Sequence, residues 1–152
     1  MYESTLFYLI IGAGIIGLTV ARELLSKGYN DILIIDKEAD VGVHASGRNS
    51  GVLHSGIYYH GDTNKAKFCQ AGSQLMKAFC KTYDLPVYEC GKAIVARYAS
   101  ELPTLEMLYE RATVNGARVE MISERKLKSK EPIALTVEQA LWSHDSAVVN
   151  PK

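Results

Sequence analysis

Three segments at the start of the chain follow a strand, helix and strand pattern. Residues 6–11 (LFYLII) form an apolar run that ends at a glycine, which is typical of a buried strand. Residues 15–27 place apolar side chains on one face at helical spacing, and Gly28 follows as a stop. A second apolar run, residues 32–35 (ILII), ends at Asp36. The pattern predicts a βαβ unit with two parallel, fully buried strands.

Residues 64–83 carry a second apolar stripe at helical spacing. The stripe predicts another helix, capped by Asn64 and packed in the core through its apolar face. We interpret the stripe as core packing and not as a surface for a cofactor. The positions expected to face the core are Ile16, Val20, Leu24 and Leu25 in the first helix, and Phe68, Gly72, Leu75, Met76, Phe79, Cys80 and Tyr83 in the second.

The rest of the chain predicts shorter elements. Two apolar runs, 87–89 and 93–97, flank Gly91 and predict a small β-hairpin. The other expected elements are a helix over 101–115, a strand over 119–122, a basic helix over 123–130 capped by Ser123, and a last strand over 139–142. Residues 41–64 form a long glycine-rich loop, and their histidine and aromatic content favours a functional loop over a disordered one.

Composition places the chain among ordinary globular domains. Its 152 residues are 47% hydrophobic and 22% charged, which excludes disordered and collagen-like chains and suits one domain. The formal net charge is zero, so no global field attracts nucleic acid or an anionic membrane. Residues 5–21 carry no charge, but glycines interrupt this stretch and a spanning helix needs about 20 apolar residues. We therefore expect neither nucleic-acid binding nor a membrane anchor.

The three cysteines form no CxxC pair, which indicates free thiols in a reducing compartment. The four histidines lack cysteine or carboxylate partners at the spacing of metal ligands. We therefore expect a cytoplasmic chain without a metal site.

Residues 12–17 (GAGIIG) carry the candidate chemistry, because they match GxGxxG between a buried strand and a helix. Gly12 permits the tight turn, Gly14 lets a diphosphate approach the backbone, and Gly17 lets helix and strand pack closely. The helix N-terminus offers free N–H groups to phosphate. The pattern predicts a dinucleotide site, and a glycine-rich turn without a ligand is the alternative.

Asp36 extends this motif, since it ends the second strand 19 residues after Gly17. A carboxylate there can accept hydrogen bonds from ribose hydroxyls and would repel a 2′-phosphate, which favours an ADP-ribose or FAD adenosine over NADP. We add Ile15 and Ile16, within the turn, and Lys37 to the expected cofactor-binding positions.

Four segments carry a resemblance to a known family. They are GAGIIG at 12–17, GRNSGVLHSGIYY at 47–59, ECGKAIVA at 89–96 and LPTLEMLYERATVNG at 102–116. Together they resemble the N-terminal part of FAD-dependent oxidoreductases of the D-amino-acid oxidase superfamily, and within it the enzymes that oxidise L-2-hydroxyglutarate. The resemblance implies an α/β fold with a Rossmann-like FAD-binding βαβ unit, additional helices and a small hairpin. It implies oxidation of a 2-hydroxy acid by hydride transfer to flavin.

The same resemblance implies roles for the loop. Its flavin-contacting positions would be Ser46, Arg48, Asn49, Ser50 and Gly51. His54 would lie near the flavin ring and accept the proton of the substrate hydroxyl, although a neutral hydrogen-bonded loop histidine is the alternative. Tyr58 and Tyr59 would line the substrate pocket, with ordinary loop packing as their alternative.

Family members are more than twice as long as this chain. The resemblance therefore implies that residues 1–152 are the N-terminal portion of an FAD/NAD(P)-binding domain, with the substrate domain absent. We expect weak FAD binding, no turnover, and self-association or a complementing second chain through the open edge of the first strand. The family's electron acceptors are oxygen or a quinone, which implies peripheral contact with the inner membrane for a full-length enzyme.

Several alternatives stay open. An amino-acid or amine oxidase and a relative of glycerol-3-phosphate dehydrogenase belong to the same superfamily. A catalytically silent nucleotide-binding fragment and an NAD-dependent dehydrogenase are the alternatives outside that chemistry.

Overall fold

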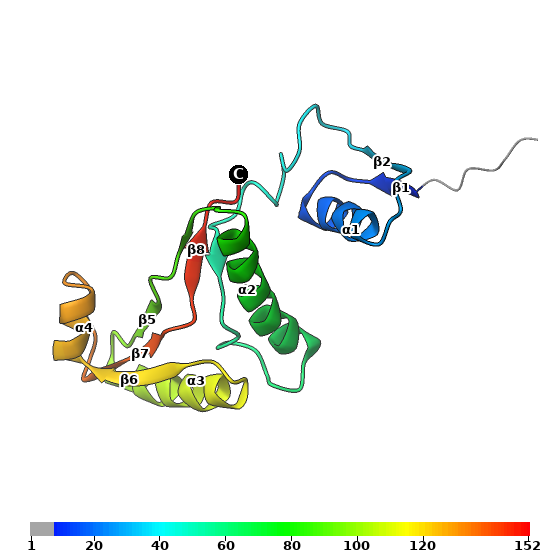
Figure 1. The fold of residues 1–152 in the computed structure, drawn as a ribbon. Coiled ribbons are helices and arrows are strands. Elements are labelled where there is room, and N and C mark those ends of the chain that lie inside the picture. Colours follow the sequence, from blue (N-terminus) through cyan, green and yellow to red (C-terminus); the bar gives the residue numbers. More distant parts are fainter. Residues whose placement is uncertain (1–7) are drawn as a thin grey trace, which may run out of the picture. The chain divides into compact units, whose positions relative to one another are not determined.

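Two parallel strands and the helix between them begin the fold (Figure 1). The computed structural model describes residues 8–152, which form two units. Unit 1 comprises the described residues up to Ser50 with Pro151–Lys152, and unit 2 comprises Gly51–Asn150. The boundary falls inside the glycine-rich loop that the sequence presents as one run.

Unit 1 is the predicted βαβ unit. It contains β1 (Tyr8–Ile11), α1 (Ile15–Ser26) and β2 (Ile32–Ile35). The two strands are parallel over four residue pairs, from Tyr8 opposite Ile32 to Ile11 opposite Ile35. Residues 6 and 7 of the predicted strand lie outside the described residues. The parallel pairing confirms the prediction made from the two apolar runs.

The prediction that both strands are fully buried is wrong. Burial alternates along each strand, and the side chains of Leu9, Ile11 and Leu33 are 49%, 80% and 51% exposed. Tyr8 and Ile10 point to the other face and are half-buried. Among residues 8–50 the only helix is α1, so one face of the strand pair stays uncovered within unit 1.

The predicted core face of α1 is also wrong. Ile16 is 74% exposed, and Val20 and Leu25 are also exposed; Leu24 is half-buried, and the buried residue of the helix is Ala21. A Cβ built at position 17 would lie 3.2 Å from the side chain of Ile10, so Gly17 faces β1. Small residues four positions apart thus bring the helix close to the sheet, and its large apolar side chains lie elsewhere.

Unit 2 contains two antiparallel sheets of three strands among the described residues, in the orders β3-β8-β4 and β5-β7-β6. Its strands are β3 (Val52–Leu53), β4 (Val87–Tyr88), β5 (Lys92–Val95), β6 (Val119–Ser123), β7 (Gln139–Ser143) and β8 (Ala147–Val149). Its helices are α2 (Asn64–Thr82), the 3-10 turn Ala99–Glu101, α3 (Leu102–Val114) and α4 (Glu124–Lys130).

The predicted hairpin around Gly91 does not form. The strands β4 and β5 exist, but β4 pairs with β8 and β5 pairs with β7. Gly91 lies between the two sheets, where its N–H bonds the carbonyl of Ser146 and a Cβ would lie 2.6 Å from the Trp142 ring. The chain therefore crosses from one sheet to the other at Gly91 instead of turning back.

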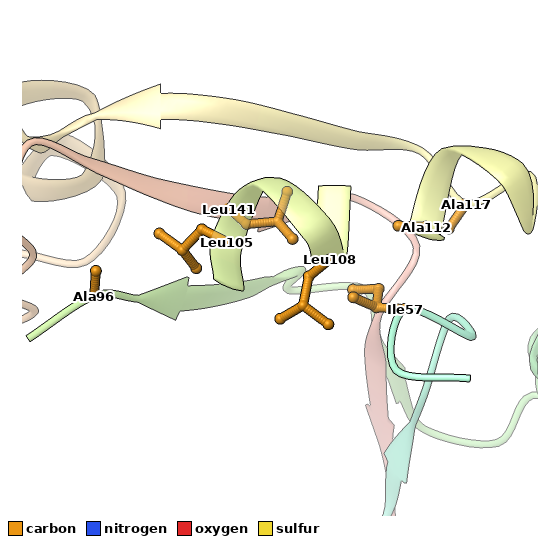
Figure 2. Close-up of a cluster of buried hydrophobic side chains, with 7 residues drawn as sticks. All are labelled: Ile57, Ala96, Leu105, Leu108, Ala112, Ala117 and Leu141. Atoms are coloured by element: carbon orange, nitrogen blue, oxygen red, sulfur yellow. The ribbon is translucent and has the colours of Figure 1, made fainter. Parts of the chain in front are cut away.

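The main core of unit 2 lies where α3 packs on the β5-β7-β6 sheet (Figure 2). Leu105 and Leu108 project from α3, and Leu141 of β7 is fully buried beside them. The cluster consists of Ile57, Ala96, Leu105, Leu108, Ala112, Ala117 and Leu141. Ile57 belongs to the loop before α2, so this core fixes part of the segment that carries candidate site residues.

Helix α2 departs from its prediction in two ways. Its N-cap is Thr63, whose Oγ1 accepts a hydrogen bond from the N–H of Ala66, and Asn64 is the first helical residue. The predicted core stripe is largely uncovered, with Phe68 73% and Leu75 71% exposed. The buried residues of the helix are the small side chains Ala66, Ser73 and Cys80, and of these Cys80 belongs to the predicted stripe.

The second half of unit 2 follows its predictions closely. The expected helix over 101–115 corresponds to α3 and its preceding 3-10 turn, and Ser123 caps α4 by accepting a hydrogen bond from the N–H of Lys126.

All three cysteines are free thiols, and Cys80 is buried. Within residues 8–152, no helix is long and apolar enough to cross a membrane, and no three His, Cys, Asp or Glu side chains gather as metal ligands.

Candidate functional site

The glycine turn between β1 and α1 can be built only with glycine at two positions. Gly12 has a φ of +110°, in the left-handed region, and its N–H bonds the carbonyl of Ile35 at 2.7 Å. A Cβ at position 17 would lie 1.9 Å from the Gly12 carbonyl oxygen. Glycine is therefore favoured at position 12 by the backbone conformation and required at position 17 by the lack of space.

Among the described residues, one side chain bonds the free N–H groups at the N-terminus of α1. Helix geometry leaves the N–H groups of Ile15, Ile16 and Gly17 without intrahelical acceptors. Ser46 Oγ accepts the hydrogen bond from the Ile15 N–H at 2.9 Å. A Cβ on Gly14 would lie 3.1 Å from the same Ser46 oxygen, so glycine at 14 keeps this approach free. The structure thus brings Ser46 to the predicted turn.

Asp36 also lies against the turn. Its Oδ2 accepts a hydrogen bond of 2.6 Å from the N–H of Ala13, and its Oδ1 accepts one of 2.9 Å from the N–H of Glu38. These two backbone donors, Ala13 first, hold the pKa of Asp36 below its usual value. The exposed carboxylate is therefore ionised at neutral pH, and its remaining lone pairs are available to sugar hydroxyls.

A hollow of about 240 Å³ lies beside Asp36 within unit 1. Its lining combines aliphatic side chains with three carboxylates: Ala13, Leu18, Ile34, Asp36, Glu38, Ala39, Asp40 and Val41. A lining of carboxylates and aliphatic side chains suits a nucleoside without a 2′-phosphate. The turn, the open helix end and this hollow together fit the diphosphate and adenosine of a dinucleotide.

The other predicted cofactor residues of unit 1 lie in the loop after β2, where Asn49 and Lys37 contact residues of the same loop. Asn49 Nδ2 donates hydrogen bonds to the carbonyls of Ala45 and Ser46, at 3.1 and 2.9 Å, so its amide stabilises its own turn. Lys37 Nζ lies 3.9 Å from Glu38 Oε1, and Arg48 and Ser50 are exposed. Their contacts with a cofactor stay a prediction.

The remaining predicted site residues belong to unit 2. Gly51 is buried, and its carbonyl accepts a hydrogen bond from the N–H of Val149. The rings of His54 and Tyr58 lie edge to face with centroids 6.4 Å apart, and both residues are exposed. Tyr59 lies under the ammonium group of Lys65, 4.5 Å from its ring centroid. His54 and Tyr58 are thus neighbours, and their roles toward flavin and substrate stay a prediction.

Lys92 joins this pair and was not among the predicted site residues. Its Nζ donates a hydrogen bond of 2.7 Å to the Tyr58 hydroxyl. Partial desolvation of the ring, although the residue is exposed overall, and secondly the charge of Lys92 lower the pKa of His54 below its usual 6.5. The neutral imidazole therefore dominates at neutral pH. Lys92 stands within the ECGKAIVA segment, but its chain position gives no sign that it meets Tyr58.

Two side chains of α3 and its C-cap fix the backbone of this loop. Arg111 Nη1 donates to the carbonyl of Tyr58 at 2.9 Å. Asn115 Nδ2 donates to the carbonyls of Gly56 and Tyr59, at 2.7 and 2.8 Å. The turn over 56–59 therefore gets its shape from α3. Sequence reasoning missed both residues, because contacts over more than fifty positions leave no local signal.

Curated relatives share substantial sequence with this chain. The mitochondrial L-2-hydroxyglutarate dehydrogenase of Mus musculus is 43% identical over 124 residues, 80% of this chain and 27% of that protein. The protein of the same name in Caenorhabditis elegans is 41% identical over 143 residues, 93% of this chain and 33% of that protein. The chain thus spans about a third or less of the length of these relatives.

Solved structures share its fold. An L-alpha-glycerophosphate oxidase from Mycoplasma pneumoniae with FAD bound has a TM-score of 0.82 and 27% identity, over 95% of this chain and 39% of that one. A glycine oxidase from Geobacillus kaustophilus has a TM-score of 0.83 at 20% identity, over 95% of this chain and 40% of that one, and shows likeness of fold alone.

The family comparison covers nearly the whole chain. Residues 8–152 match the family described as FAD dependent oxidoreductase (DAO). The match and the relatives confirm the resemblance drawn from the four sequence segments. With a βαβ unit, a glycine turn and an acidic residue at that turn, the chain belongs to the DAO family of FAD-dependent oxidoreductases.

Proposed function

We propose that this chain carries the FAD-binding βαβ unit of an oxidoreductase that acts on a 2-hydroxy acid. The observation that carries the proposal is the hydrogen bond from the Ala13 N–H to the Asp36 carboxylate, which brings an ionised acid to the glycine turn. The open N–H groups of Ile16 and Gly17 would bind the diphosphate, and Asp36 would bind the ribose hydroxyls. The family, described as FAD dependent, supports FAD over NAD.

We propose L-2-hydroxyglutarate as the substrate, supported by the names of relatives that are 41% and 43% identical. Bound FAD would supply the hydride acceptor for the oxidation of the carbinol carbon. His54 is neutral near pH 7, because burial and Lys92 lower its pKa, and it would accept the proton of the substrate hydroxyl. Tyr58 would line the substrate side of the site, beside His54.

The other positions complete the proposal. Gly14 and Ser46 would lie along the diphosphate, since Ser46 already bonds the first turn of α1. We propose Arg48 as a partner for phosphate or a substrate carboxylate, because a guanidinium binds either in a bidentate way. Tyr59 would line the substrate pocket together with Tyr58.

Flavin binding is tested by titrating FAD with the 152-residue chain and following quenching of flavin fluorescence. We expect saturable binding that Asp36→Ala weakens at least fivefold and that excess NAD does not displace. Lys128→Gln is the control, because its lysine forms an exposed ion pair within α4. Absence of saturable binding, or equal affinity for Asp36→Ala, would reject FAD binding at this turn.

The reaction is tested with the longest polypeptide that the gene encodes, by reduction of an artificial dye. We expect L-2-hydroxyglutarate to be oxidised in preference to its D-enantiomer and to glycerol 3-phosphate. His54→Ala should abolish dye reduction while FAD affinity stays unchanged. A preference for glycerol 3-phosphate would instead support the activity named for the Mycoplasma structure.

The cellular location is a separate proposal. Three free thiols suit a reducing compartment, for which we propose the cytoplasm, whereas the curated relatives are named as mitochondrial. Fractionation of the source cells with an antibody against the chain tests this, and recovery with mitochondria would overturn it.

A further inference from the structure

We propose that Lys92 and Tyr58 form an anion-binding pair that holds a carboxylate of the substrate beside His54. The inference deepens the proposed function, on which it rests for the identity of the substrate. It adds Lys92, from β5, to the predicted catalytic and substrate-binding residues, all of which lie in the loop.

The geometry brings two hydrogen-bond donors together. Lys92 Nζ lies 2.7 Å from the Tyr58 hydroxyl and 4.6 Å from the centroid of its ring. Because the lysine donates to the phenol oxygen, the phenol proton is directed away from Lys92. The remaining ammonium protons and the phenol proton can then bind one oxyanion together, next to the His54 ring.

Lys92 also differs from most lysines of the chain in its charge partners. Lys27, Lys37, Lys77, Lys81, Lys126 and Lys128 each form an ion pair with a carboxylate. Over residues 8–152, no carboxylate lies within ion-pair distance of Lys92, and Lys92 is half-buried. An anionic ligand would therefore meet a cation that has a phenol and an imidazole for neighbours and no competing carboxylate among the described residues.

The pair is held on a firm frame. Lys92 begins β5, where it pairs with Ser143 of β7. Tyr58 is fixed on the other side, since Arg111 donates to its carbonyl. The backbones of both residues are therefore held in place, one by a sheet and the other by a helix, which limits the ordering needed when the ligand binds.

The chemistry of the proposed substrate fits such a pair. A 2-hydroxy dicarboxylate carries two negative charges, and one carboxylate bound by Lys92 would bring its hydroxyl toward His54. The cation also favours the neutral imidazole, the form that accepts a proton. Lys92 would thus be a binding residue for substrate and a positioning residue with respect to His54.

The test is a titration of the 15N-labelled 152-residue chain with glutarate, followed by the NMR shifts of the Tyr58 and Lys92 amides and the His54 ring. Glutarate cannot be oxidised at a hydroxyl, so binding is measured without turnover. Glutaramide is the uncharged ligand control and glycerol 1-phosphate the phosphate control. The variants are Lys92→Gln, Lys92→Arg and Tyr58→Phe, with Lys130→Gln as the matched control, because Lys130 lies 4.4 Å from the Trp142 ring centroid.

We expect saturable shifts with glutarate and none with glutaramide. Lys92→Gln should raise the dissociation constant about tenfold, Tyr58→Phe should raise it less, and Lys92→Arg and Lys130→Gln should leave it within twofold. Equal affinity for Lys92→Gln and wild type, or no saturable shift at these groups in wild type, would overturn the proposal. Tighter binding of glycerol 1-phosphate than of glutarate would overturn its assignment to a carboxylate.

The FAD titration separates this proposal from the proposed function. Glutarate binding that depends on Lys92, in a chain that fails to bind FAD, would leave the anion site standing and reject the flavin function. FAD binding, together with glutarate binding that is unchanged by Lys92→Gln, would support the flavin function and reject the anion site.

Discussion

The hydroxyl of Ser46 accepts a hydrogen bond of 2.9 Å from the backbone N–H of Ile15, across 31 positions of the chain. The loop after β2 thereby caps the helix that precedes it. The same hydroxyl limits the space above Gly14, so loop and turn form one structure.

We expect Ser46→Ala to destabilise unit 1 by about 1 kcal/mol, because the substitution removes a side-chain cap from a helix N-terminus. Hydrogen exchange of the β1 and β2 amides measures the change in unfolding free energy. Ser26→Ala is the matched control: Ser26 Oγ donates to the Glu23 carbonyl at the exposed end of α1, and its change should stay within about 0.5 kcal/mol. Equal effects of the two substitutions would contradict the capping role of Ser46.

Two glycines in helices should respond oppositely to alanine. Gly17→Ala would place a Cβ 1.9 Å from the Gly12 carbonyl oxygen, and we expect a loss of about 3 kcal/mol from unit 1. Gly72 lies in α2, and a methyl group added there would meet no atom within 4 Å, so Gly72→Ala should stabilise unit 2 by about 0.5–1 kcal/mol. Urea unfolding followed by NMR resonances of each unit tests both values.

Asp36 should make the stability of unit 1 depend on acid pH. Its folded-state pKa is lowered by the N–H donors of Ala13 and Glu38, so its stabilising contribution is fully present above the ordinary aspartate pKa of 3.8. The contribution is lost as pH falls through the lower folded pKa. In Asp36→Asn this part of the pH dependence should vanish. The measurement is the free energy of unfolding of unit 1 at several pH values below 5, for wild type and for Asp36→Asn. The same pH dependence in both would contradict the role of the carboxylate.

The titration of His54 should report the charge of Lys92. Burial is the larger cause of the lowered His54 pKa and Lys92 the smaller, so Lys92→Gln should raise this pKa but leave it below 6.5. Since the folded state prefers the neutral ring, His54 should reduce stability as pH falls below 6.5. NMR titration of the ring protons measures the pKa, and a value that Lys92→Gln leaves unchanged would show that the lysine charge does not act on the imidazole.

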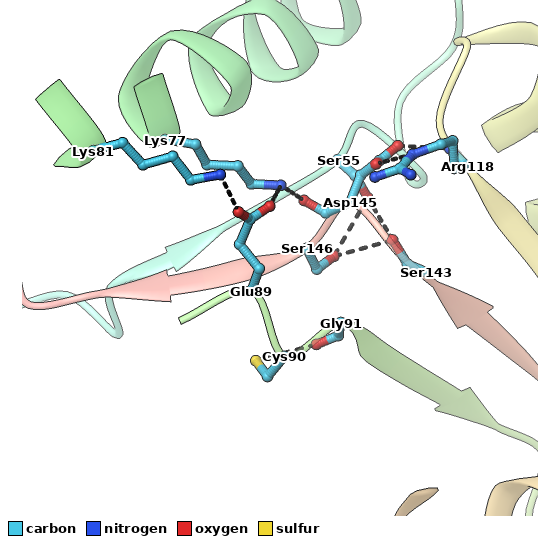
Figure 3. A network of polar contacts seen from close by, with 10 residues as sticks. All are labelled: Ser55, Lys77, Lys81, Glu89, Cys90, Gly91, Arg118, Ser143, Asp145 and Ser146. Atoms are coloured by element: carbon cyan, nitrogen blue, oxygen red, sulfur yellow. Dashed lines mark hydrogen bonds and ion pairs between the residues drawn. The ribbon is translucent and has the colours of Figure 1, made fainter. Parts of the chain in front are cut away.

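Two lysines that share Glu89 should differ in their contribution to stability (Figure 3). The side chain of Lys77 is 12% exposed, and its Nζ donates to the Asp145 carbonyl at 2.6 Å, whereas that of Lys81 is 63% exposed. Lys77→Met should destabilise unit 2 by about 1–3 kcal/mol, and Lys81→Met by less than about 1 kcal/mol. Thermal unfolding followed by Trp142 fluorescence measures both, and equal losses would mean that the burial of Lys77 adds nothing.

Local signals made much of the fold predictable. The runs at β1 and β2, the glycine turn and the cap at Ser123 each depend on a few consecutive residues, and the structure has all of them. The position of Asp36 at the turn followed from its spacing within the βαβ pattern. Short-range geometry determines such features before any distant segment packs.

Features that depend on distant segments were not predictable. Strand β8 has three residues, and β4 has two, so neither offers enough alternation to show its partner. Periodicity identified the apolar faces of α1 and α2, but it does not tell whether residues 8–152 supply a surface to cover them. Sequence reasoning did not predict three residues of the candidate site, because only the tertiary fold brings them to the turn that contains Tyr58. They are Lys92, Arg111 and Asn115.

The hydrogen bonds from Arg111 and Asn115 end on main-chain carbonyls of the turn over 56–59. Those acceptors persist whatever side chains stand at positions 58 and 59. Laboratory evolution toward new substrates can therefore randomise these two tyrosines without unravelling the loop, provided that the C-terminal turn of α3 is left as it is.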